Sequence, residues 1–183
     1  PISVLARRFG NPGRRIWYMC QGQDPDKLQQ DIPAPKSIGH GKVVPPDTRD
    51  ATVLLTYLMH MSEKVGARLR RHQLKSLTFF IGLRTANGWL GGKPRCALPT
   101  DDGQQIMALC RQVMRETWHG QGVHQVQVTA LDPVNSDVQL ELFDTSNEAH
   151  DQINTVMDAV NRRYGELALA PARLLNRSSM PNV

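Results

Sequence analysis

The chain has 183 residues, 40% of them hydrophobic, and a formal net charge of +5 at pH 7. This composition is sufficient for a folded core, while every apolar run is too short to cross a bilayer, which argues against a membrane-spanning protein. Its three cysteines, Cys20, Cys96 and Cys110, are widely spaced and form no CxxC pair. We therefore expect reduced thiols in a cytoplasmic protein rather than a disulfide framework or a zinc site.

Charge is distributed unevenly along the chain. From Lys36 to Arg95, eleven lysines and arginines stand against three acids, whereas from Asp132 to Glu166 eight acids stand against two arginines. The first stretch would attract phosphate and the second would avoid it. The alternative is two solvated surfaces of opposite sign.

Residues 1–35 are mixed and basic and end in Asp31-Ile32-Pro33-Ala34-Pro35. Because proline fixes φ and lacks an N–H donor, the two prolines predict a linker at residues 31–36. The chain starts at Pro1 without an initiator methionine, so we expect it to be cut from a longer protein.

The next segments predict a strand, a long helix and a second strand. Residues 37–44 are glycine-rich, and glycines in a strand let a phosphate or another backbone approach closely. Asp47 or Thr48 is the expected N-cap of the helix, whose apolar residues recur at helical spacing. Strict alternation over residues 77–84 predicts a strand with one apolar and one mostly polar face.

A hairpin, a second helix and a last strand follow. Asn87-Gly88 is typical of a tight hairpin, so we expect a partner strand over residues 89–98. Asp101 with Gln104 resembles a capping box at the start of the helix. Residues 123–131 alternate again and predict the last strand.

The predicted order over residues 37–132 is therefore βαββαβ, an α+β fold. Its apolar faces indicate a four-stranded antiparallel sheet with two helices on one face and an open, polar second face. This layout serves many unrelated functions. A stand-alone RNA-binding or regulatory module would need base-stacking aromatics, and the open face of residues 77–84 offers one, Phe80. A small ferredoxin-like enzyme would need a catalytic cluster, and we find none.

After Pro133 the chain becomes acidic. Thr145 and Glu148 form a second capping-box pattern, which predicts a C-terminal helix that stops at Gly165. One face of this helix is apolar and carries Ala149, Ile153, Val156, Met157, Val160 and Tyr164.

Three segments carry a family resemblance. They are Phe9–Trp17 (FGNPGRRIW), Gln21–Pro25 (QGQDP) and Lys36–His40 (KSIGH). The first two resemble the end of the thumb, and the third the opening of the little finger, of Y-family translesion DNA polymerases of the DNA polymerase IV/V type. Gln21 departs from the arginine usual in that family, which weakens one expected thumb–DNA contact.

The resemblance implies a helical thumb remnant at 1–30, the linker at 31–36, a little finger at 37–132, and a C-terminal tail with a helix at 133–183. It also implies a grip on the phosphates of template–primer DNA that does not depend on sequence. The expected DNA contacts are Lys36, Ser37, Gly39, His40, Lys42, Arg84, Lys93 and Arg95. Arg68, Arg70 and Arg71 are expected to be mostly solvated on the helix layer.

A second motif, Gln139-Leu140-Glu141-Leu142-Phe143, resembles the bacterial sliding-clamp-binding pentapeptide. Gln139 would bind in a polar pocket of the clamp and Leu142 and Phe143 in an apolar one, with Leu140 adding packing. The alternative is an ordinary half-buried edge strand.

The resemblance implies no catalytic residues and no metal or cofactor in this chain, since the family holds Mg²⁺ in a palm domain farther upstream. Asp101 and Asp102 are better explained as a helix N-terminus than as metal ligands. The expected protein is a monomer of the bacterial cytoplasm and nucleoid, acting in DNA damage tolerance, with DNA and the sliding clamp as partners and no membrane.

Overall fold

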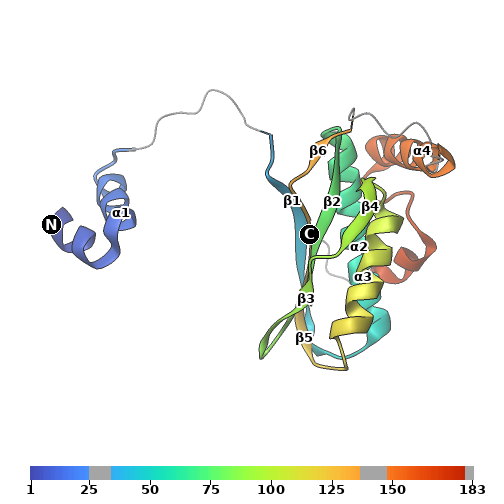
Figure 1. Ribbon diagram of the computed structural model, residues 1–183, viewed down its shortest axis with the longest axis horizontal. Coiled ribbons are helices and arrows are strands. Elements are labelled where there is room, and N and C mark those ends of the chain that lie inside the picture. Colours follow the sequence, from blue (N-terminus) through green and yellow to red (C-terminus); the bar gives the residue numbers. More distant parts are fainter. Residues whose placement is uncertain (25–33, 137–147, 180–183) are drawn as a thin grey trace. The chain divides into compact units, whose positions relative to one another are not determined.

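The computed structural model describes residues 1–24, 34–136 and 148–179 of the chain (Figure 1). The chain divides into two compact units, Pro1–Ala34 and Pro35–Val183, each of which is described by itself. No helix within the described ranges is long and apolar enough to cross a membrane.

The first unit is built around helix α1 (Ile2–Cys20). The helix is interrupted at Gly10, whose φ of 63° lies in the left-handed region that glycine adopts without strain. Pro12 follows inside the same helix. This Gly-Asn-Pro sequence divides α1 into two helical arms, and the helical segment expected ahead of the sheet is confirmed.

The second unit contains an antiparallel sheet with the strand order β1-β5-β2-β3. The strands of the described residues are β1 (Ser37–Thr48), β2 (Leu74–Thr85), β3 (Gly88–Gly92), β4 (Arg95–Thr100), β5 (Val123–Leu131) and β6 (Val134–Asn135). Both β3 and β4 pair with β2, and the short β6 pairs with its first residues. The predicted strand over 89–98 is thus broken in two. At the break the Pro94 carbonyl accepts a hydrogen bond from the Phe79 N–H.

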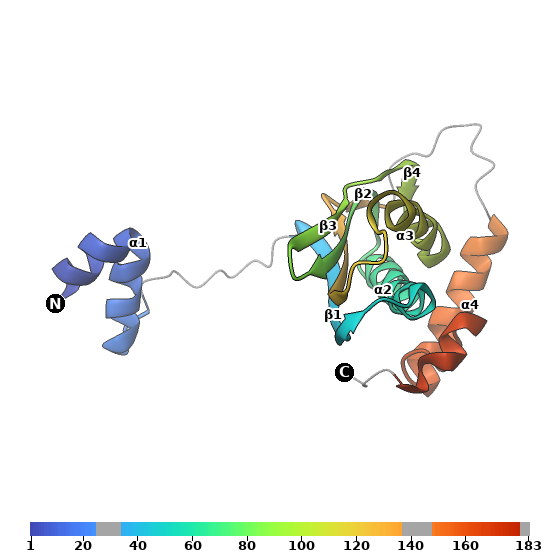
Figure 2. The ribbon, with the colours of Figure 1, turned by 90° about the horizontal axis from the view of Figure 1, so that it is seen from below.

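Helices α2 (Ala51–Arg71) and α3 (Gly103–Thr117) cover one face of this sheet. Helix α4 (Glu148–Tyr164) lies beyond them, on the side away from the sheet (Figure 2). The 3-10 helix Ala172–Ser179 packs on α2. The α2 residues that recur at helical spacing are fully buried, as their spacing predicts: Leu54, Leu58, Met61, Val65 and Leu69. The predicted α+β class, with two helices on one face of the sheet, is confirmed.

Both helix starts differ from those expected. Asp50 caps α2, where its carboxylate accepts from the Thr52 N–H at 2.7 Å, and neither Asp47 nor Thr48 does so. The reason is that β1 continues to Thr48, which pairs with Val123. Asp102, rather than Asp101, caps α3 through the Gln104 N–H at 3.0 Å.

The hairpin between β2 and β3 forms as predicted, but its turn is displaced by one residue. Thr85 pairs with Gly88, so the two turn residues are Ala86 and Asn87 instead of Asn87 and Gly88. This register places Trp89 directly opposite Arg84.

Helix α4 turns its polar face toward the rest of the unit. Asn154 is buried and Asp158 contacts Arg70 of α2, whereas Ile153, Val156 and Tyr164 are all more than half exposed. Part of the apolar face identified in the sequence therefore points outward, whereas Met157 and Val160 of the same face are half-buried.

Candidate nucleic-acid interface

Within the described residues of the second unit, no helix covers the face of the sheet opposite α2 and α3 (Figure 1). Period-2 alternation sends Phe79, Ile81 and Leu83 of β2 into the core and leaves Phe80 and Arg84 on the other side. The same rule buries Val126 and Val128 of β5 under the helices. We call the uncovered side the open face.

Strand pairing arranges the open face in four rows that cross the strands. The rows are Ser37–Leu131–Thr78–Arg95, Gly39–Thr129–Phe80, Gly41–Gln127–Gly82–Gly91 and Val43–Gln125–Arg84–Trp89. None of these positions holds an acid. Since Thr78 and Arg84 are six residues apart on one strand, the cations Arg95 and Arg84 stand about 20 Å apart along the strands.

Glycine is required in the second row. A Cβ atom at Gly39 would overlap the side chain of Thr129, which lies directly across the pair. With Gly41 it leaves a shallow depression of about 480 Å³ on the open face. The depression is lined by Ser37, Gly39, His40, Gly41, Gln125, Gln127 and Thr129. Because these glycines have no side chains, the open face is recessed at the edge of the sheet.

The outer edge of β1 presents backbone groups. The Asp132 N–H donates to the Lys36 carbonyl at 3.1 Å, so Lys36 and every second residue after it face β5. Ser37, Gly39 and Gly41 therefore direct their N–H and C=O groups away from the sheet. Arg68 Nη1 donates to the Gly39 carbonyl at 2.9 Å, which satisfies that acceptor and places a positive charge at the edge, beside the outward N–H groups.

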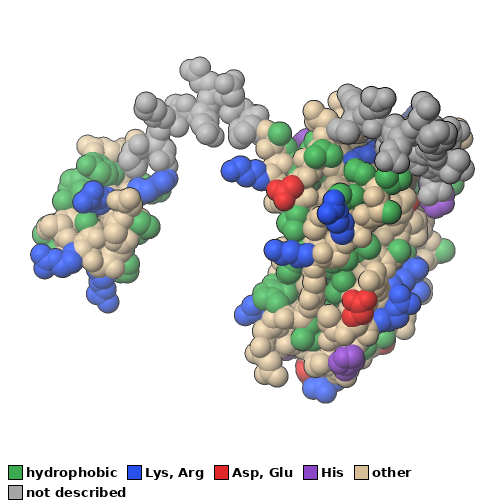
Figure 3. Space-filling view, in the orientation of Figure 1, with side chains coloured by type: hydrophobic (Ala, Val, Ile, Leu, Met, Phe, Trp, Pro, Cys, Tyr) green, Lys and Arg blue, Asp and Glu red, His purple; other side chains and the backbone are tan. Residues whose placement is uncertain are grey.

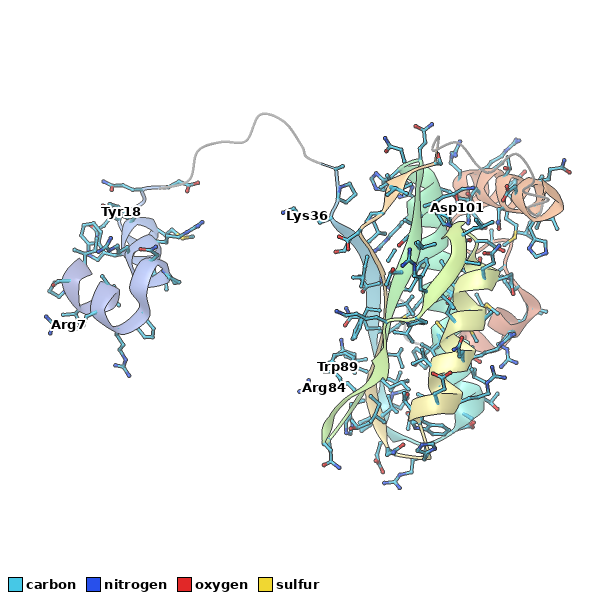
Figure 4. The ribbon with its side chains drawn as sticks, in the orientation of Figure 1. Arg7, Tyr18, Lys36, Arg84, Trp89 and Asp101 are labelled. Atoms are coloured by element: carbon cyan, nitrogen blue, oxygen red, sulfur yellow. The ribbon has the colours of Figure 1, made fainter. Side chains whose placement is uncertain are left out.

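The expected contacts on the first strand fall into two groups. Ser37 and Gly39 belong to the open face and the edge, and Figure 4 shows the labelled Lys36 beside them, on the side away from the helices. The exposed Asp132 neighbours Lys36 at this corner. His40 and Lys42 alternate to the other side, toward α2.

His40 is placed as a packed ring rather than as a cation. Its ring centroid lies 6.3 Å from that of His60 of α2, in an edge-on arrangement. Burial lowers the pKa of His40, and the nearby charges of Lys64 and Arg68 lower it further. At neutral pH we expect an uncharged imidazole here, able to accept or donate a hydrogen bond but not to neutralise a phosphate.

The remaining expected contacts lie on the hairpin side of the sheet. Arg84, Lys93 and Arg95 are all exposed, and the register puts Arg84 and Arg95 on the open face. Figure 3 shows Lys and Arg side chains spaced along this side of the second unit. The structure therefore brings Lys36, Arg84 and Arg95 to one surface.

The helix arginines correct one expectation. Arg70 is not solvated: it binds both carboxylate oxygens of Asp158 at 2.7 and 2.9 Å and the Asp101 carbonyl at 2.7 Å. Arg68 is bound to Gly39, as described above, and only Arg71 of the three is exposed. Sequence reasoning missed these roles because their partners lie far away in the chain.

The same layer holds an acidic group that sequence reasoning did not single out. Burial raises the pKa of Glu63 to about 7, against the opposing charge of Arg70 and with further raising by Asp102 and Asp158. Gln104 Nε2 donates to its carboxylate at 3.3 Å. Within the described residues, no group of three or more His, Cys, Asp or Glu side chains could hold a metal ion.

The sequence analysis also missed a residue of the open face, Trp89. It lies across from Arg84 and beside Phe80, with ring centroids 6.2 Å apart. The hairpin signal could have placed it on the open face, because its partner across either turn, Ala86 or Arg84, lies on that face. The proposed clamp-binding residues Gln139, Leu140, Leu142 and Phe143 lie outside the described residues.

Comparisons with known proteins agree on one family. Residues 35–142 match the impB/mucB/samB family C-terminal domain. The putative UV-damage repair protein UvrX of Bacillus subtilis is 27% identical over 179 residues, which cover 94% of this chain and 43% of that protein. DNA polymerase IV of Moorella thermoacetica is 28% identical over 169 residues, 91% of this chain and 42% of that protein.

A solved structure, the complex of beta-clamp processivity factor and little finger domain of PolIV, resembles 57% of this chain at 16% identity and a TM-score of 0.45, and 93% of that chain is covered. The chain spans less than half the length of the two relatives above. Because the family match covers more than half of the chain, this protein belongs to the impB/mucB/samB family, and the expected kinship with Y-family DNA polymerases is confirmed.

Proposed function

We propose that the open face and the outer edge of β1 bind the phosphates of template–primer DNA without reading its bases. In this proposal the chain is the DNA-gripping and clamp-tethering region of a translesion polymerase that acts in DNA damage tolerance. The relatives named above are a repair protein and a polymerase, which supports this role.

One observation carries the proposal. The open face holds exposed cations at opposite ends, glycines between them, and no acid at any of its row positions. Phosphate contacts need cations and N–H donors at a surface that a backbone can approach, and they carry no sequence information. Recognition of base edges would instead need several polar side chains that reach into a groove, and two of the four rows of the open face carry glycines in their place.

The test is a fluorescence anisotropy titration of the 183-residue chain with two blunt duplexes of unrelated sequence, at several salt concentrations. If three or four phosphates are neutralised, raising the salt from 50 to 200 mM should weaken binding by about 40- to 150-fold. Both duplexes should behave alike. Binding that ignores salt, or that strongly prefers one sequence, would contradict the proposal.

We also propose that Gln139, Leu140, Leu142 and Phe143 tether the chain to a bacterial sliding clamp. The support is the pentapeptide pattern and its place between β6 and α4 in the sequence. Replacing Leu142 and Phe143 with Ala should abolish capture by an immobilised clamp and leave duplex affinity unchanged. Retained capture by the clamp would reject the assignment.

We infer that nucleotide transfer, and the Mg²⁺ it requires, depend on residues outside this chain. The support is that the relatives are more than twice as long as the stretch they share with it. With Mg²⁺, nucleotides and a primed template, the chain alone should bind DNA and extend no primer. Primer extension by the purified chain would contradict this inference.

A further inference from the structure

An exposed aromatic site lies at one end of the open face. It is formed by Trp89 and Phe80 with Arg84, and we call it the aromatic ledge (Figure 4). The Arg84 guanidinium carbon stands 5.6 Å from the centre of the Trp89 ring, and the Phe80 ring meets Trp89 edge-on at 66°. Trp89 remains 41% exposed.

The rings of the aromatic ledge pack directly on the backbone of two glycines, and this close packing fixes where the rings lie. Gly82 lies between Phe80 and Arg84, and a Cβ atom there would come within 2.8 Å of the Trp89 ring and 2.9 Å of the Phe80 ring. Gly91 pairs with Gly82, and at φ 149° a Cβ on it would overlap the Ile81 carbonyl. The two aromatic rings therefore pack closely on a glycine floor held by the paired strands β2 and β3.

Covering Gly82 is one role for Trp89, and it accounts for the buried part of the ring. This role does not explain why the large indole of Trp89 stays exposed beside the Arg84 cation. It also does not explain why the pair lies at the end of a face whose row positions hold no acid. Aromatic rings on positively charged sheets stack on bases of single strands, because every base has a π face. Arg84 stands where it can bind the phosphate of a nucleotide stacked in this way.

We propose that the aromatic ledge binds an unpaired nucleobase of the single strand that adjoins the duplex held by the open face. The proposal rests on the proposed DNA binding and names a second mode within it. Base pairs inside the duplex are excluded as the occupant, because both of their faces are covered by their neighbours in the stack. The charge of Arg84 favours a nucleotide over an uncharged peptide or sugar.

The experiment compares three DNA probes with the 183-residue chain by fluorescence anisotropy at one salt concentration. They are a blunt duplex, the same duplex with a short single-stranded overhang at either end, and that duplex with abasic residues throughout the overhang. The abasic probe keeps the phosphates and removes the bases. We expect the overhang to tighten binding by about fivefold or more, and the abasic overhang to lose that base-dependent part of the gain.

Variants locate the effect at the ledge. Trp89→Leu keeps an apolar cover over Gly82 but removes the π face, so it should abolish the difference between the normal and abasic overhangs. Trp89→Phe should retain most of that difference. Leu98→Ala is the matched control, because Leu98 is equally exposed at 41% and lies on β4. Thermal unfolding of each variant checks that it is folded.

The outcomes separate this proposal from the one it rests on. If the wild-type chain binds the blunt duplex in a salt-dependent way but does not distinguish normal from abasic overhangs, the aromatic ledge proposal is wrong and the proposed function stands. If the chain binds no duplex, the proposed function fails. Tighter binding of single-stranded RNA than of every DNA probe would overturn both. The abasic comparison uses unmodified protein, so it holds even if Trp89→Leu fails to fold.

Discussion

Arg84 and Arg70 show how two sides of one small domain use the same residue type. Arg84 stands exposed on the open face beside a tryptophan, whereas Arg70 is part-buried among Asp158, the Asp101 carbonyl and Glu63. On the helix side, acidic residues of the protein itself neutralise the positive charge of Arg70. The contacts of Arg70 thereby link α2, α3 and α4. On the open face no acid occupies the rows, so the charge remains available to a ligand.

The largest expected effect comes from removing the Arg70 contacts on the helix side. Arg70→Ala removes the partner of Asp158 and leaves that carboxylate and the Asp101 carbonyl unsatisfied in a part-buried site, so the free energy of unfolding should fall by about 3 kcal/mol. Urea unfolding measures it. Arg71→Ala, one residue along and exposed, should change stability by less than about 0.5 kcal/mol. Equal losses in the two variants would show that the Arg70 network does not hold the helices together.

A smaller loss of stability is expected from a substitution on the open face that changes the packing between β1 and β5 and leaves the charge unchanged. Gly39→Ala should destabilise the protein by about 1–2 kcal/mol, since its Cβ would overlap Thr129. Gly92→Ala is the matched control, because a Cβ at Gly92 meets nothing within 4 Å. Adding Thr129→Gly to Gly39→Ala should restore part of the loss beyond additivity. Full additivity of the two substitutions would mean that they do not meet across the strands.

The pH dependence of stability sharpens the contrast between buried and exposed charge. The pKa of Glu63 is raised from 4.5 to about 7, so the folded protein holds this proton where the unfolded chain has released it. The stabilising contribution is therefore complete below pH 4.5 and is lost as the pH rises toward about 7. Arg70, Asp102 and Asp158 face the same carboxyl from three helices and act as described above.

Glu63→Gln should remove that slope, which amounts to roughly 1–3 kcal/mol between the two pH values. Urea unfolding at a series of pH values measures it for the variant and the wild type, and their difference cancels contributions from other groups such as His40. Glu116→Gln, an exposed site on α3, should leave the slope in place. A wild-type slope retained in Glu63→Gln would contradict the assignment.

The parts of the fold that sequence predicted well are those set by local periodicity. Alternation over residues 77–84 assigned the buried and open sides of β2, since successive side chains in a strand point to opposite faces. The helical spacing of Leu54, Leu58 and Met61 likewise identified the buried face of α2. Each of these residue patterns lies within a single strand or helix, so it can be recognised without knowing which elements pack together.

The remaining features depend on register or on distant contacts. Asp47 and Asp50 are both plausible N-caps, and the pairing of Thr48 with Val123 decides between them. The contact of Arg70 with Asp158 joins residues 88 apart in the chain, which no local pattern contains. The neighbours of Trp89 also depend on register: a turn at Asn87-Gly88 sets it opposite Ala86, whereas the true register sets it opposite Arg84 and near Phe80.

The central claim, that the open face binds DNA through its phosphates, is tested most directly by the salt dependence of binding in Lys36→Gln/Arg84→Gln/Arg95→Gln. If these three cations neutralise phosphates, the slope of log affinity against log salt should become less steep by about 2.7 relative to wild type. The free energy of unfolding should change little. A triple variant that keeps both the wild-type affinity and the wild-type slope would contradict the account.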